Sequence, residues 1–196
     1  MKKRTIALLM AVVMLFGATV GGTLAWLQAE SKPVVNTFTA GKIEIDLNET
    51  DVDKDDNTKA NAYKVVPGNK YVKDPVVTVK AGSEECYVFV EIVEENNTFD
   101  NGKYIEYAIN TADWTLVTGE TNVYYYREKV NALDKEVVMT STVLATDADG
   151  NNITINPNIE KTDMTAATAA KLTFNAYAVQ SANLADANAA WAASGF

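Results

Sequence analysis

The segment that most constrains the fold is ECYVFVEIVEE, residues 85–95, because its apolar side chains fall on both sides of an extended backbone. One face of such a strand carries Cys86, Val88, Val90 and Ile92, and the other carries Tyr87, Phe89 and Val93. A strand that is apolar on both faces is typical of a sheet that is covered on both sides. The chain is therefore expected to build a layered β structure around this segment.

The rest of the chain after residue 40 contains further short alternating runs separated by polar turns. Ile43, Ile45 and Leu47 alternate with acidic residues, and KLTFNAYAV alternates over residues 171–179. Other strands are predicted within residues 62–82 and at 104–109, 114–117, 123–128, 137–139 and 152–155. This series favours an all-β fold, specifically a jelly-roll-like β-sandwich.

Two alanine-rich stretches predict short peripheral helices. Residues 162–171 offer Thr162 as an N-cap, and alanine is a strong helix former. Residues 183–193 form a C-terminal helix that places Leu184 and Trp191 on one face. We expect that face to dock on the sandwich.

Residues 1–25 have the pattern of a secretory signal peptide, with basic residues at 2–4 followed by an apolar run and small residues. The run is shorter than the roughly twenty residues of a membrane-spanning helix, and no basic stop-transfer cluster follows it. Cleavage is predicted after Ala25, so that a single domain, residues 26–196, begins at Trp26. A cut after Ala29, with bulky Leu27 at the −3 position, and a retained anchor are the alternatives.

The net charge and the number of cysteines limit which binding partners and which cellular compartment fit this chain. Removing residues 1–25 lowers the Lys and Arg count from 17 to 14 and leaves Asp and Glu at 26, so the net charge falls from −9 to −12. This charge argues against nucleic acid, and against membrane association after cleavage, because both favour basic patches. Cys86 is the only cysteine, which excludes an intramolecular disulfide, and its apolar strand predicts a buried thiol. We expect a secreted protein, extracellular or associated with the cell surface.

The chain contains no histidine. This absence excludes Ser-His-Asp and Cys-His catalysis and histidine-based zinc motifs, and a lone cysteine cannot supply a cysteine-type zinc site. Carboxylate chemistry remains available, but no feature of the sequence favours it. We therefore expect no catalytic residues, no resident cofactor and no enzymatic activity.

Two patterns suggest ligand binding. Asp51, Asp53 and Asp55 reproduce the opening of a calcium loop, but Asp56 replaces the glycine of its sixth position and Ala62 the glutamate of its twelfth. The loop is therefore interpreted either as a solvated acidic loop or as a weak calcium site. Tyr124 and Tyr126 share one face of a strand and could stack on a sugar. Together these patterns support an alternative function, a secreted carbohydrate- or calcium-binding adhesin-like module.

The segment Ser31–Thr39 follows the predicted cleavage site and contains Val34, Val35 and Phe38. Two interpretations of it remain open. It can be the first strand of its own domain, or a strand that adds to the sheet of a neighbouring subunit.

Three stretches carry a resemblance to a known family. They are GGTLA followed by NTFTAGKIEIDL, the pair Pro67–Lys70 and Lys73–Pro75, and LTFNAYAVQ before the alanine- and tryptophan-containing end. Together they resemble the TasA/camelysin family of proteins secreted by Gram-positive bacteria. The resemblance spans nearly the whole chain, and it is strongest at residues 18–47 and 65–93.

The resemblance implies a jelly-roll subunit of biofilm-matrix fibres, released by a SipW-type signal peptidase. The mature N-terminal strand, residues 26–39, would complete the sheet of the next subunit, so the partners would be other copies of the chain and other matrix proteins. The family's metalloprotease label finds no support in a chain without histidine.

Overall fold

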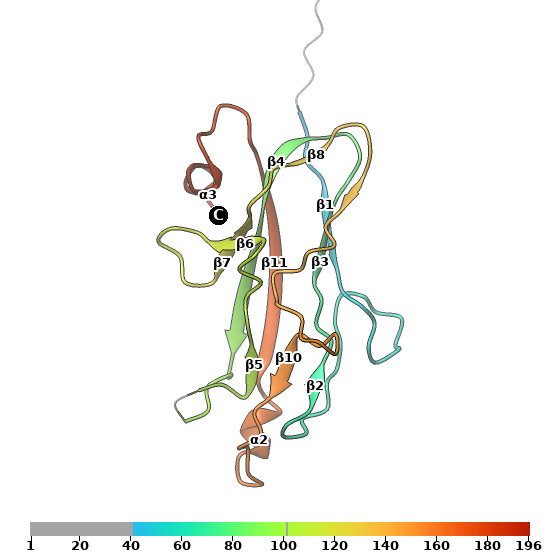
Figure 1. Ribbon diagram of the computed structural model, residues 1–196, viewed down its shortest axis with the longest axis vertical. Coiled ribbons are helices and arrows are strands. Elements are labelled where there is room, and N and C mark those ends of the chain that lie inside the picture. The colour runs from blue at the N-terminus through green and yellow to red at the C-terminus, as the bar shows by residue number, and fades with distance from the viewer. Residues whose placement is uncertain (1–40, 101) are drawn as a thin grey trace, which may run out of the picture. The chain divides into compact units, whose positions relative to one another are not determined.

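The computed structural model describes residues 41–100 and 102–196, which belong to a compact unit spanning Ala40–Phe196 (Figure 1). The predicted cleavage residues Ala25 and Trp26 lie outside the described residues. The predicted assembly-strand residues Val34, Val35 and Phe38 also lie outside them.

Strands dominate the described unit. In chain order they are β1 (Ile45–Asn48), β2 (Lys70–Tyr71), β3 (Val76–Val79), β4 (Ser83–Glu95), β5 (Ile105–Tyr107), β6 (Trp114–Leu116), β7 (Val123–Tyr126), β8 (Val130–Ala132), β9 (Val137–Val138), β10 (Ile153–Ile155) and β11 (Lys171–Gln180). Two helices accompany them, α2 (Met164–Ala167) and α3 (Ala187–Ser194). Neither is long and apolar enough to cross a bilayer, and the same holds for every helix in the described part of the chain.

The strands form three antiparallel sheets, with the orders β1-β3-β9, β2-β10-β5 and β11-β4-β7-β6, and β8 also pairs with β4. The main core lies between the largest sheet and the two smaller ones, because it combines residues of β4 with residues of β3 and β10. The all-β sandwich with short peripheral helices that was predicted from the sequence is confirmed.

The pair β4–β11 is the longest ladder, with ten residues in register from Lys171 opposite Glu95 to Gln180 opposite Cys86. Val88 and Val90 point into the main core, whereas Phe89 belongs to a second cluster on the outer face of the sheet. The predicted burial of this segment on both faces is therefore confirmed.

Helix α3 covers that outer face. Its N-cap Asp186 accepts a hydrogen bond of 2.8 Å from the backbone N–H of Ala189, and Gly195 ends the helix in the left-handed conformation with φ of 75°. The Trp191 ring lies 5.1 Å from the Phe89 ring, and Leu184 joins the same cluster. The predicted docking through Trp191 and Leu184 is confirmed, but the helix begins at Ala187 rather than at residue 183, so Leu184 lies in the preceding turn and not on a helix face.

Helix α2 differs from the prediction of a helix over residues 162–171. It spans only Met164–Ala167, its N-cap is Asp163 rather than Thr162, and no side chain caps it. The Asp163 carboxylate instead accepts a hydrogen bond of 3.1 Å from the backbone N–H of Glu160, so it closes the preceding turn. The helical propensity of alanine is a weak preference, and the turn into β11 overrides it.

Candidate functional site: a groove between β1 and β11

One edge of β11 is free within the described residues. The N–H of Ser181 donates to the carbonyl of Glu85 at 2.9 Å, and these two residues lie directly opposite each other in the register. Because such bonding alternates along an antiparallel ladder, odd-numbered residues of β11 bond to β4. The even-numbered residues, Leu172 to Gln180, therefore point their N–H and C=O groups away from β4. Among residues 41–100 and 102–196, no strand pairs with that edge.

Strand β1 presents an edge to the same space. The N–H of Lys80 donates to the carbonyl of Glu44 at 2.8 Å, so the even-numbered residues of β1 bond to β3. Ile45 and Leu47 direct their backbone groups to the opposite side. Strands β1 and β11 lie next to each other (Figure 1).

A groove of about 1040 Å³ extends along both strands. The segment after β1, the residues before β3 and the turn after α2 contribute to its wall. The lining residues include Ile45, Leu47, Glu49, Lys59, Tyr63, Lys73, Ala170, Leu172, Phe174 and Ala176. The groove therefore offers apolar side chains from β11 and polar side chains from the segment after β1.

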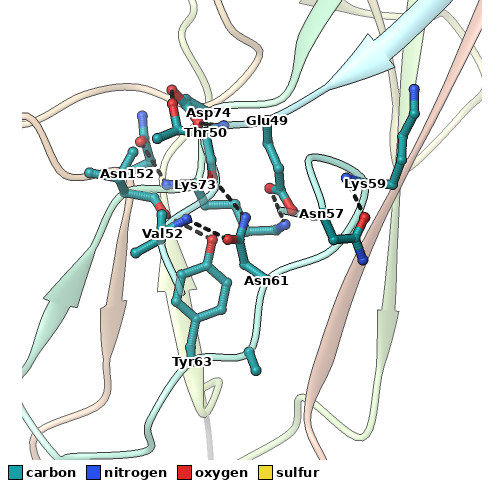
Figure 2. Close-up of polar contacts among 12 residues, drawn as sticks. Glu49, Thr50, Val52, Asn57, Lys59, Asn61, Tyr63, Lys73, Asp74 and Asn152 are labelled. Atoms are coloured by element: carbon teal, nitrogen blue, oxygen red, sulfur yellow. Dashed lines mark hydrogen bonds and ion pairs between the residues drawn. The ribbon is translucent and has the colours of Figure 1, made fainter. Parts of the chain in front are cut away.

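A buried ion pair lies in the groove wall. The Nζ atom of Lys73 lies 2.6 Å from Oε2 of Glu49, and their side chains are only 10% and 7% exposed. The same Nζ lies 5.1 Å from the centre of the Phe174 ring and 5.8 Å from that of Tyr63 (Figure 2 labels Glu49, Lys73 and Tyr63). Burial, followed by the negative charge of Glu49, raises the pKa of Tyr63, so its hydroxyl stays protonated at neutral pH. Removal of either partner would leave an unpaired buried charge in this wall, which is costly.

The acidic loop after β1 is tied to the body of the domain (Figure 2). Asp74 accepts hydrogen bonds from the backbone N–H of Thr50 at 2.9 Å and from its hydroxyl at 2.7 Å. Asn61 accepts from the N–H of Val52 at 2.6 Å and donates to the carbonyl of Thr50 at 2.9 Å. The Tyr63 hydroxyl donates to the carbonyl of Val72 at 2.9 Å. Both ends of the loop are therefore fixed.

The structure brings the predicted calcium candidates together, since one carboxylate oxygen each of Asp51, Asp53 and Asp55 lies within 4.8 Å of the others. Backbone N–H groups already bond to some of these carboxylate oxygens. Asp51 accepts hydrogen bonds from three N–H groups, and Asp53 accepts one from the N–H of Ala62 at 2.6 Å. Desolvation opposes ionisation of Asp51, but those N–H groups outweigh it and lower its pKa. The carboxylates can hold a cation, and they also stabilise the loop in its absence.

The other residues singled out in the sequence lie in the core. Tyr124 and Tyr126 are half-buried and pack against the main core, with the Tyr126 ring 5.5 Å from that of Trp114. Burial also raises the pKa of Tyr124. Cys86 is fully buried, as predicted, and burial raises the pKa of its thiol to about 11. These side chains therefore act in packing.

The sequence did not reveal the groove. Alternation identifies a strand and its two faces, but it does not show which edge is paired. One signal was present, because Ala176 and Ala178 place small side chains on the inner face of an otherwise bulky strand. Small residues there leave space between β11 and β1.

No family model, curated protein or solved structure matches the chain.

Proposed function

We propose that this protein is a secreted structural subunit of extracellular or biofilm-matrix fibres. In the fibre, the mature N-terminal segment Trp26–Thr39 of one subunit adds as a strand to the groove between β1 and β11 of its neighbour. The observation that carries this proposal is the edge of the ten-residue strand β11 beside that groove, which no strand of residues 41–100 or 102–196 pairs with. Edge addition uses backbone hydrogen bonds for affinity and side-chain pockets for specificity.

The dimensions of donor and acceptor agree. At about 3.3 Å per residue, the ten residues of β11 offer an edge of about 33 Å. The fourteen residues from Trp26 to Thr39 reach about 46 Å when extended. The donor is therefore long enough to pair with the whole edge.

The donor sequence has a suitable alternation. In an extended segment Val34 and Phe38 share one face, and Val35 lies on the other. The face that turns inward would meet Phe174 and Ala176, which pack against the main core. Phe38 provides the larger apolar surface, so we assign its face to the groove.

Secretion and cleavage fit this role. Removal of residues 1–25 by a SipW-type signal peptidase would free the donor strand from its membrane-bound leader. Assembly would then start only outside the cell. The absence of histidine agrees with a structural rather than an enzymatic protein.

The first experiment compares two purified proteins by negative-stain electron microscopy, one starting at Trp26 and one starting at Ala40. We expect fibres only from the longer protein, and we expect a synthetic peptide of residues 26–39 to bind the shorter one. Fibres from both proteins would place the interface elsewhere, and clean monomers of both would contradict the proposal.

A matched pair of variants tests the orientation of the donor. Phe38→Asp should abolish fibres, because it places a charge in the groove, whereas Val35→Asp should reduce them less. Equal effects of the two substitutions would contradict the assigned face.

One observation favours a second function, a calcium-binding module. The three carboxylates of Asp51, Asp53 and Asp55 are close enough to share a cation. Calorimetric titration of the mature protein with calcium tests it, with Asp53→Asn as the matched variant. Absence of both heat and a shift in melting temperature would exclude this function, since a bound ion stabilises the folded state.

A further inference from the structure

The two edges that face the groove differ in what already occupies them. Nothing in the described residues pairs with the edge of β11, but the segment Thr58–Lys59 bonds to the edge of β1. The Nζ atom of Lys59 donates to the carbonyl of Leu47 at 2.6 Å and also contacts the Asp46 carboxylate. The carbonyl of Thr58 accepts from the N–H of Glu49 at 2.9 Å.

The third edge group is also satisfied from within the chain. The N–H of Leu47 donates to Oδ1 of Asp46 at 3.0 Å. Thus both backbone groups of Leu47 and the N–H of Glu49 have partners, although no strand pairs with this edge of β1 among the described residues. These are groups that a strand entering the groove beside β1 would bond.

A strand that enters beside β1 could replace each of these hydrogen-bond partners with one of its own backbone groups. An incoming backbone N–H can replace the Lys59 ammonium at the Leu47 carbonyl. Incoming carbonyls can replace Asp46 at the Leu47 N–H and Thr58 at the Glu49 N–H. Because each lost hydrogen bond is replaced by another, the exchange leaves no buried group unpaired.

We propose that Thr58–Lys59 is a latch that covers the β1 side of the groove in the free subunit and is displaced by the donor strand. This inference rests on the proposed function and adds its regulation. The latch protects an exposed strand edge before assembly, and it slows the entry of a strand. Lys59 thereby sets the rate at which subunits join.

The latch can open without unfolding the loop. The side chains of Lys59 and Asp46 are 56% and 39% exposed, and exposed ion pairs are weak. The loop stays attached through Thr50 to Asp74 and through Tyr63 to Val72. Only the tip that carries Thr58 and Lys59 has to move.

The test measures assembly of the mature protein by light scattering, started by proteolytic removal of an extension placed before Trp26. Lys59→Met keeps the aliphatic stem and removes the ammonium, and Asp46→Asn removes the carboxylate that holds it. Both should shorten the lag and raise the initial rate by about 1.4- to fivefold, the range expected when an exposed ion pair is lost.

Lys80→Met is the matched control. Lys80 forms an ion pair with Glu136 at 3.0 Å, with both side chains about half exposed, and neither residue lines the groove. This variant has the same charge change and also loses an exposed ion pair, so it should assemble at the wild-type rate. Thermal melting of the uncut proteins verifies that each variant is folded.

The outcomes separate the two proposals. Fibres that grow equally fast from the wild type, Lys59→Met and Lys80→Met would overturn the latch and leave the proposed function standing. Slower growth of folded Lys59→Met would also overturn the latch, because Lys59 would then help to hold the strand. Absence of fibres from every protein would overturn both proposals.

Discussion

Strands β1 and β11 line the same groove, but they differ in whether the backbone groups on their outer edges have hydrogen-bond partners. The four-residue strand β1 has its outward groups at Leu47 bonded by Asp46 and Lys59. The ten-residue strand β11 turns the backbone groups of its even-numbered residues away from β4, and no partner strand bonds them in the described residues. Proteins normally shorten, charge or cover an exposed edge, because it is a template for pairing with other chains. Within the described part of the chain, the edge of β11 is therefore the one that lacks such protection.

The largest expected effect comes from proline on the two edges of β11. Asn175 faces β4 with its N–H, so Asn175→Pro should lower the free energy of unfolding by at least about 3 kcal/mol, since a ladder bond is lost and the ring clashes with β4. Ala176 faces the free edge, and Ala176→Pro should cost only about 1 kcal/mol while preventing fibre growth. Urea unfolding and electron microscopy measure the two effects.

Asn175→Ala controls for the lost side chain, which donates to Glu91 at 3.1 Å. If Ala176→Pro were as destabilising as Asn175→Pro, the assignment of one paired and one free edge would be wrong.

The second effect concerns the outer face of the same strand pair, which α3 covers. Trp191→Ala should lower the free energy of unfolding by about 2–3 kcal/mol, because the ring packs on Phe89 and Tyr177 and its N–H donates to Glu120 at 3.0 Å. Phe196→Ala, at a side chain that is 65% exposed, should cost less than about 1 kcal/mol. Urea unfolding measures both. Loss of fibres from a folded Trp191→Ala protein would show that the interface extends to this face.

A smaller effect on stability should appear at acidic pH, and it should come from Asp46 in β1. The hydrogen bond from Lys59, with those from Asn48 and Leu47, lowers the pKa of Asp46 from 3.8 to about 2. A lowered pKa contributes stability that is fully present above the unfolded value and is lost as the pH falls through about 2. Urea midpoints between pH 5 and pH 2 should therefore fall less steeply for Asp46→Asn than for the wild type. Parallel profiles would show that the contact with Lys59 does not form.

The smallest effect on stability, and the simplest test of the core, concerns Cys86. Because the thiol is fully buried and burial raises its pKa to about 11, it should resist alkylation at pH 8 in the folded protein. In urea it should react at the rate of an ordinary exposed cysteine. Fast reaction without denaturant would indicate that β4 separates from β8 in the native state.

The sequence predicted those strands and helices that a pattern of apolar residues within a short segment indicates. The strand of residues 85–95 corresponds to β4, which begins at Ser83, and that of residues 171–179 corresponds to β11, which extends to Gln180. The C-terminal helix and its contact through Trp191 were also predicted, although the helix begins only at Ala187 and does not include Leu184. In each case local alternation and burial point to the same structure.

The groove and its occupied edge could not be predicted in this way. Lys59 reaches Leu47 across twelve positions of the sequence, and β11 contacts β1 although the two strands lie near opposite ends of the described chain. The Lys73–Glu49 pair likewise depends on tertiary packing.

The predicted N-cap Thr162 was wrong because the turn around Asp163 overrides local helix propensity. The carboxylates of the three candidate aspartates do lie close together, but this follows largely from their being only two positions apart in the sequence.

The separation of groove and donor segment has a consequence for any polymer built from this chain. In the proposed fibre each copy receives a strand at its β11 edge and gives its own N-terminal segment, so the contact is heterologous. A heterologous contact that does not close into a ring produces a linear, unbranched filament with direction. One end of that filament carries a vacant groove and the other an unpaired strand. A short peptide of residues 26–39 would cap the vacant groove of the filament and would also fill the grooves of free subunits, so in excess it would stop growth at both ends.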